Sequence, residues 1–166
     1  MKLLRSFFLL LLCPLLFLSA CTQNEAMPQE VLGALLETAK DVPSGQIYHS
    51  EAEEGSESYC SPELLTSLYG EEAAERFETV EAYAIYLSSF TTPYELAVFR
   101  CYSASDANRI ETLCLLRAEE LRVALRNTPY EAVAQELRVI LKGKWVFFLL
   151  CQEAESVGQT ALHAVT

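Results

Sequence analysis

The sequence is poor in the side chains that most catalytic motifs need. Its 166 residues include two histidines and one tryptophan. No G-x-S-x-G, H-E-x-x-H or phosphate-binding loop is present, which excludes the common hydrolase, zinc-protease and nucleotide motifs. His163 lies in a tail that we expect to fray, so a histidine base would depend on His49 alone. The sequence therefore predicts no catalytic residue and favours a non-enzymatic role.

Basic residues are scarce as well. The chain has 12 lysines and arginines against 23 aspartates and glutamates, for a net charge of −11. Residues 21–95 hold 15 of these acids, balanced only by Lys40 and Arg76. Nucleic-acid phosphates and an anionic membrane surface would both repel this part of the chain. The charge therefore argues against nucleic acid as a partner, and its simplest role is solubility.

The chain also lacks an apolar run long enough to cross a bilayer. The run at residues 7–18 spans twelve residues and is interrupted by Pro14, whereas a transmembrane helix needs about 20 residues. Lys2 and Arg5 precede this run, and polar residues follow it from Thr22 onward. This arrangement is typical of a cleaved secretory signal.

Small residues and a cysteine close the apolar run: Leu18, Ser19, Ala20 and Cys21. The pattern resembles the lipobox of bacterial lipoproteins. The resemblance implies that cleavage occurs before Cys21, that its thiol carries a diacylglycerol, and that its amino group can take a further acyl chain. Stable anchoring takes two acyl chains, which a diacylated cysteine supplies. We therefore expect a protein held at the cell membrane and facing outside the cytoplasm; a plain secretory signal cut elsewhere is the alternative.

These features divide the chain into a signal peptide at residues 1–20, a tether at residues 21–27 and a single domain at residues 28–166. The signal carries two basic residues and no acidic ones, so its removal changes the net charge from −11 to −13. The 146 residues that remain are the size of one domain. A tether of seven residues reaches about 23–25 Å at most, which keeps the domain close to the bilayer.

Four cysteines remain in the predicted domain: Cys60, Cys101, Cys114 and Cys151. They allow three pairings, and the absence of C-x-x-C argues against a thioredoxin-like redox site and a zinc ribbon. The last three sit in apolar patterns, where cysteine is commonly a small buried hydrophobe. We expect free, buried thiols. One structural disulfide is the alternative, because the outside of a cell permits it.

Apolar periodicity predicts an α+β domain. Longer helices are expected to begin at Pro28, at Ser61 and at Ser105 or Asp106, the last one running to about Arg126. Shorter helical stretches are expected at residues 71–78, 130–136 and 153–164. Alternating patterns predict strands at residues 46–49, 82–88, 95–102, 137–141 and 144–151. The expected architecture is a small antiparallel sheet of about four strands, with the long helix packed on one face and shorter helices around it.

The strand expected at residues 144–151 is apolar on both faces, with Trp145 and Phe147 on one face and Val146 and Phe148 on the other. Such a strand should lie inside the sheet and be covered on both sides. The long helix can cover one face, and the other needs the amino-terminal helix or a partner. Trp145 is therefore a candidate contact to a ligand or partner.

Arg117 interrupts the apolar stripe of the long helix at helical spacing. Its stem can pack on the core while the guanidinium reaches an edge or an acidic partner. The alternative is a contact to an anionic ligand, so Arg117 is the second candidate site residue. The acidic loop at residues 51–57 lacks the alternating aspartates of a calcium loop, and we expect it to be solvated, with no metal bound.

Several segments together resemble a family of domains of unknown function. They are residues 68–70, the strand at 83–86, residues 94–100 followed by the long helix, Tyr130, and the hairpin at 142–146. Members of this family are small predicted lipoproteins, mainly of Gram-positive anaerobes. The resemblance covers about residues 60–151 and implies an envelope location, an α+β domain and no assigned activity. Cys101, Cys114 and Cys151 do not belong to its pattern.

We expect an envelope lipoprotein that binds a partner protein or a small ligand without catalysis. One alternative is an envelope enzyme or ligand-binding protein whose site the sequence does not reveal. The other is a thiol-based redox sensor that uses the four remaining cysteines.

Overall fold

The computed structural model describes residues 26–89 and 92–166, which form an α+β domain. Its antiparallel sheet has five strands in the order β1-β2-β3-β5-β4. The strands are β1 (Gly45–His49), β2 (Val80–Ser88), β3 (Glu95–Cys101), β4 (Arg138–Lys142) and β5 (Trp145–Leu150). The predicted fold class is confirmed. The sheet has five strands because the short stretch at Gly45–His49 pairs with β2 along its whole length.

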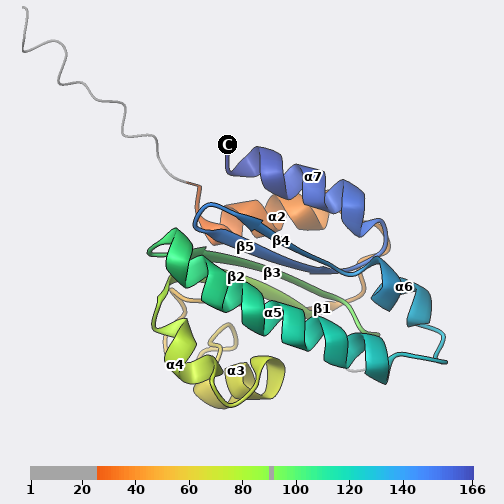
Figure 1. Ribbon diagram of the computed structural model, residues 1–166, viewed down its shortest axis with the longest axis horizontal. Helices are drawn as coiled ribbons and strands as arrows, with labels where there is room; N and C mark the ends of the chain where they lie inside the picture. The colour runs from red at the N-terminus through yellow and green to blue at the C-terminus, as the bar shows by residue number, and fades with distance from the viewer. Residues whose placement is uncertain (1–25, 90–91) are drawn as a thin grey trace, which may run out of the picture.

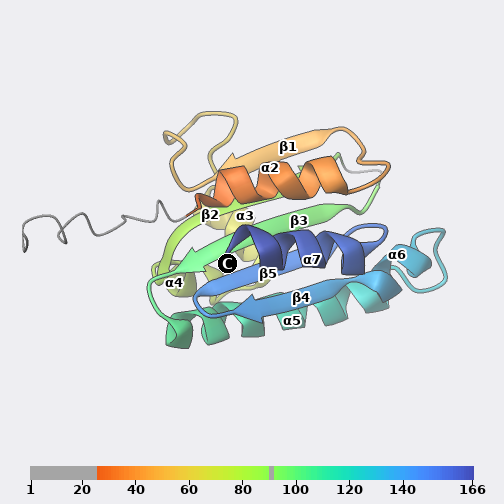
Figure 2. The ribbon, with the colours of Figure 1, turned by 90° about the horizontal axis from the view of Figure 1, so that it is seen from above.

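Helices cover both faces of the sheet (Figures 1 and 2). One face carries α3 (Pro62–Tyr69), α4 (Ala73–Phe77) and the long α5 (Ala104–Ala124). The other face carries α2 (Pro28–Thr38) and α7 (Ala154–Ala164), which lie side by side. The short α6 (Glu131–Glu136) lies at one end, between α5 and β4. All described helices and strands fall between residues 28 and 164, so the chain from Thr22 onward contains the whole described fold.

Two apolar layers lie on either side of the central strands β3 and β5. Phe99 and Phe148 point to the layer beneath α5, whereas Val98 and Phe147 point to the layer beneath α2 and α7. All four side chains are fully buried. This confirms that a strand apolar on both faces lies inside the sheet.

One expectation about the carboxyl-terminal half needs correction. The stretch at residues 153–164 is helical, but it is not frayed, because Val157 and Ala161 of α7 are buried against the sheet. Together with α2 it covers the second face of β5, and α2 is the amino-terminal helix that we expected as one of the two possible covers of this face. Gly158 permits the close approach: a Cβ at this position would lie 2.7 Å from Cδ1 of Ile140 on β4.

Capping residues set the helix boundaries, and one of them was predicted at the wrong place. Ser61 caps α3 as expected, with its Oγ accepting from the backbone N–H of Leu64 at 3.2 Å. The cap of α5 is Ser103 rather than Ser105 or Asp106. Asp106 lies three residues after the cap, and its N–H donates to Ser103 Oγ at 3.2 Å. A serine followed three residues later by an acid is an N-terminal capping signature, and here it begins two or three residues earlier than we predicted.

All four cysteines of the domain are free and buried. Burial raises the pKa of Cys60, Cys101 and Cys151 to about 12. The pKa of Cys114 is raised well above its ordinary value by burial and by the nearby Glu95 carboxylate. Because the thiolate is the reactive form, these thiols are protected from oxidation at neutral pH.

The predicted signal peptide, the cleavage motif at residues 18–21 and the lipidation site lie outside the described residues. Within the described part of the chain, no helix is both long enough and apolar enough to span a membrane.

Candidate functional site

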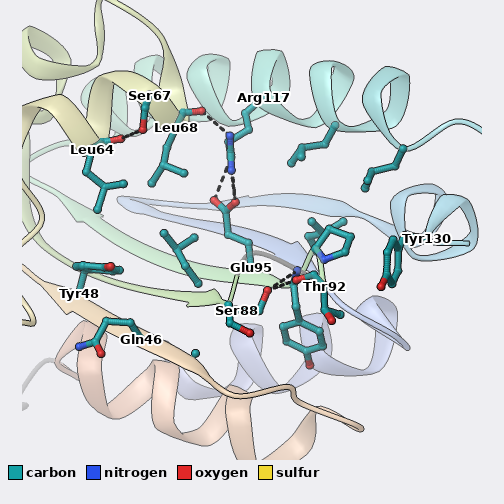
Figure 3. A pocket seen from close by; sticks show the side chains of 18 of the residues that line it. Gln46, Tyr48, Leu64, Ser67, Leu68, Ser88, Thr92, Glu95, Arg117 and Tyr130 are labelled. Atoms are coloured by element: carbon teal, nitrogen blue, oxygen red, sulfur yellow. Dashed lines mark hydrogen bonds and ion pairs between the residues drawn. The ribbon is translucent and has the colours of Figure 1, made fainter. Parts of the chain in front are cut away.

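A cleft of about 830 Å³ opens at one end of the sheet, between the sheet and the two helices α3 and α5 (Figure 3). Ligand sites typically have volumes of about 300–1,000 Å³. The floor is the end of the sheet at which β2 and β5 finish and β3 begins, with Leu87, Leu150 and Glu95. The cleft is therefore built where chain segments far apart in sequence meet.

The two sides of the cleft differ in character (Figure 3). The helical side is mainly apolar, with Leu64 and Leu68 from α3 and Leu121 from α5, extended by Leu125, the cap of α5. The opposite side, formed by β1 and the turn between β2 and β3, carries amide and hydroxyl groups. These polar side chains belong to Gln46, Tyr48, Ser88 and Thr92.

Arg117 enters this cleft from α5 and meets Glu95, which rises from the start of β3 (Figure 3). Its Nη2 donates to Glu95 Oε2 at 2.7 Å, and its Nε donates to the same oxygen at 2.9 Å. Its Nη1 donates to the Leu68 carbonyl at 2.8 Å, which ties α5 to α3. The side chains of Arg117 and Glu95 are only 15% and 3% exposed. The guanidinium thus reaches an acidic partner, which confirms the structural interpretation of this residue.

Tyr69 completes the polar cluster at the back of the cleft. Its hydroxyl donates to Glu95 Oε1 at 2.8 Å, and its ring lies 5.6 Å from the Arg117 guanidinium carbon. Burial, and then the Glu95 carboxylate, raise the pKa of Tyr69 well above its ordinary value. Burial alone would lower the pKa of Arg117, but Glu95 outweighs it and the pKa is raised. Arg117 and Glu95 form a buried ion pair, so together they add no net charge to the cleft.

Sequence reasoning identified Arg117 but missed Glu95. The signal was present, because Glu95 shares one strand face with Ala97 and Phe99 in the alternating pattern of β3. An acid on the apolar face of a buried strand requires a partner. Arg117, on the buried stripe of the next helix, was the natural candidate for that partner.

Trp145, the other candidate contact, lies at the opposite end of the sheet and is only 7% exposed. Its ring stacks on Phe147, with centroids 6.3 Å apart, and lies 5.7 Å from the guanidinium carbon of Arg100. Nε of Arg100 pairs with Glu81 at 3.0 Å, and its Nη1 donates to the carbonyl of Ala26 at 3.1 Å. Trp145 is thus part of a buried cluster that holds the start of the domain, and it does not contact the cleft.

The described lining of the cleft holds polar groups but no catalytic constellation. Its only ionisable acid, Glu95, is paired with Arg117. Ser67 donates its hydroxyl to the Leu64 carbonyl at 2.8 Å, and neither histidine belongs to the lining. A serine nucleophile needs an adjacent base, which this arrangement does not provide. The described residues also contain no group of three His, Cys, Asp or Glu side chains that could hold a metal ion.

No family model, no curated protein and no solved structure matches the chain. The resemblances to the lipobox and to a family of domains of unknown function therefore stay predictions from the sequence.

Proposed function

We propose that the protein is an envelope lipoprotein, anchored through Cys21, that binds a small molecule in the cleft between α3, α5 and the sheet. The observation that carries this proposal is a leucine-lined cleft of about 830 Å³ with a buried, fully paired polar cluster at its back. An apolar hollow with a few fixed polar groups is the usual form of a ligand site.

The geometry favours a small ligand over a partner protein. One of the reasons to expect a partner protein was the second apolar face of β5, and that face is covered by α2 and α7. The cleft, by contrast, is lined by half-buried leucines that no other described element covers, such as Leu64 and Leu121. Binding a molecule there would remove apolar surface from water, worth roughly 25 cal/mol per Å².

Binding without catalysis is the better supported form of this function. The polar groups of the cluster are engaged with one another: Arg117 with Glu95 and the Leu68 carbonyl, and Tyr69 with Glu95. A working acid or base must instead reach the proton of a substrate. The thiol-sensor hypothesis finds no support either, because burial raises the pKa of the cysteines.

Filling the cleft should abolish binding of an apolar probe. We expect the chain from Thr22 onward to bind 1-N-phenylnaphthylamine, an uncharged dye that fluoresces in apolar surroundings, with one saturable phase. Leu125→Trp places an indole in the cleft and should weaken this binding at least about tenfold, which corresponds to about 1.4 kcal/mol. A fluorescence titration measures the change.

The matched control is Val123→Trp, two residues earlier on the same helix. Val123 is 64% exposed and does not belong to the lining. This variant should bind the dye as the wild type does. Absence of saturable binding to the wild type, or equal binding by the two tryptophan variants, would overturn the proposed ligand site.

The anchor is tested separately from the cleft. Cys21→Ser removes the thiol that would carry the lipid, so the protein should move from the membrane fraction to the soluble or secreted fraction. The free energy of retention comes from the acyl chains, at about 0.8 kcal/mol per buried CH₂, and it is lost with them. Cell fractionation followed by immunoblotting measures the shift.

Cys13→Ser is the control for this experiment, because Cys13 lies in the predicted signal and is removed with it. This variant should remain in the membrane fraction. A Cys21→Ser protein that stays membrane-bound with unchanged gel mobility would contradict lipidation at this position.

A further inference from the structure

The charge of the cleft limits what it can bind. Among the described lining residues, Arg117 and Glu95 are the only charged ones, and they neutralise each other. A charged ligand would leave water without gaining a free partner of opposite sign. Taking an unpaired ion out of water is costly. An uncharged molecule escapes this cost.

The distribution of polar groups further limits which molecules the cleft can bind. Leucines line the helical side, whereas amide and hydroxyl groups line the side formed by β1 and the turn after β2 (Figure 3). Tyr48 lies on this polar side, half-buried, with its ring packed against the apolar layer. A phenol in this setting presents an apolar body and a polar tip. The two sides therefore match a molecule with one apolar and one hydrogen-bonding part.

We propose that the ligand is an uncharged amphiphile, with an apolar part against the leucines of α3 and α5 and hydroxyl or carbonyl groups against β1. This inference rests on the proposed ligand site and adds the chemical class of its occupant. The ion pair at the back acts as a closed polar end that accepts no counter-ion. Selection against charge thus comes from a fully paired cluster, and selection for hydrogen-bonding groups comes from the β1 side.

Two competitors with the same eight-carbon chain test this. Octyl β-glucoside has an uncharged, hydroxylated head, and octyl sulfate has an anionic head. Each is added below its micelle-forming concentration to the chain from Thr22 onward with bound 1-N-phenylnaphthylamine. We expect octyl glucoside to displace the dye at a concentration at least about tenfold lower than octyl sulfate.

The comparison is made in about 0.5 M salt, because salt screens the long-range repulsion that the chain from Thr22 onward, with a net charge of −13, exerts on any anion. A preference that persists in this salt reflects the cleft itself. Equal displacement, or better displacement by octyl sulfate, would overturn the inference about charge and leave the ligand site intact. Failure of the dye to bind would overturn both the inference about charge and the proposed ligand site.

Tyr48→Phe tests the polar side. Loss of one hydroxyl should weaken octyl glucoside competition, corrected for each variant's own affinity for the dye, about threefold to tenfold, the range for one hydrogen bond. The control is Tyr102→Phe, since Tyr102 is 66% exposed and does not belong to the lining. If Tyr48→Phe competes like the control, the head group does not lie against β1.

Discussion

Arg117→Met should destabilise the domain by about 3–5 kcal/mol. The substitution leaves the Glu95 carboxylate buried, with the Tyr69 hydroxyl as the only side-chain donor that the structure places on it. Removing one partner of a buried ion pair costs this much because the remaining charge is uncompensated. The variant also loses the bond from Nη1 to the Leu68 carbonyl, which joins α5 to α3. Urea unfolding followed by circular dichroism measures the loss.

The double variant Arg117→Met/Glu95→Leu shows whether the charge is the cause. Replacing a whole buried pair by apolar residues is often neutral or stabilising, so the double variant should recover at least about 2 kcal/mol of the single variant's loss. Arg109→Met is the matched control on the same helix, because Arg109 is exposed and lies 3.9 Å from Asp106. Its effect should stay within about 0.5 kcal/mol. Equal losses for Arg117→Met and Arg109→Met would show that the pair contributes nothing.

Val157→Asp should destabilise the domain by at least about 3 kcal/mol. Val157 is buried in α7, facing the apolar layer on the sheet. A carboxylate there loses its hydration without gaining a partner, so the variant must undock α7 or take up a proton. The loss is therefore limited by the free energy of undocking the helix. Thermal and urea unfolding both measure it.

Ser156→Asp is the control for α7, since Ser156 is the preceding residue of the same helix and is exposed. The same new charge should change stability by no more than about 0.5 kcal/mol there. If α7 were frayed, Val157→Asp and Ser156→Asp would have the same effect on stability. A clear difference between them establishes that α7 packs on the sheet as the structure shows.

The secondary structure was predictable because local signals agree with the tertiary fold. The nearly continuous apolar runs of β3 and β5 reflect burial on both faces. The stop after α3 follows from Gly70, whose φ of 90° suits glycine. The α+β class and the antiparallel sheet follow from these patterns. The error of two or three residues at the start of α5 arose because Ser103 and Ser105 both offer a capping hydroxyl. Only the bond from Asp106 N–H selects Ser103.

Local sequence signals could not predict the packing of α7 on the sheet or the formation of the cleft. The sequence of α7 has an apolar side, but no local signal shows whether the helix packs on the sheet or frays. The outcome depends on whether a face of the sheet is available to it. The cleft arises from the spacing between α3 and α5, which no single segment determines. The pairing of Glu95 with Arg117, 22 residues apart, was within reach of the alternation argument. It was missed because Glu95, the first residue of the expected strand, was not assigned to either of its faces.

The hydrogen bond from Arg100 to the Ala26 carbonyl joins the start of the domain to the central strand of the sheet. Arg100 lies near the end of the central strand β3, about five residues or roughly 17 Å from Glu95 and the cleft at its start. If Cys21 carries the proposed lipid, the five residues from Cys21 to Ala26 reach about 18 Å at most. Under that proposal, a pull from the lipid would reach Ala26 before it reaches α2, and at Ala26 the hydrogen bond from Arg100 joins the chain to the central strand β3 and not to an edge strand. In that arrangement the cleft, at the opposite end of β3, would open on the side away from the membrane. Solutes arriving from outside the cell would then reach the cleft before they reach the lipid.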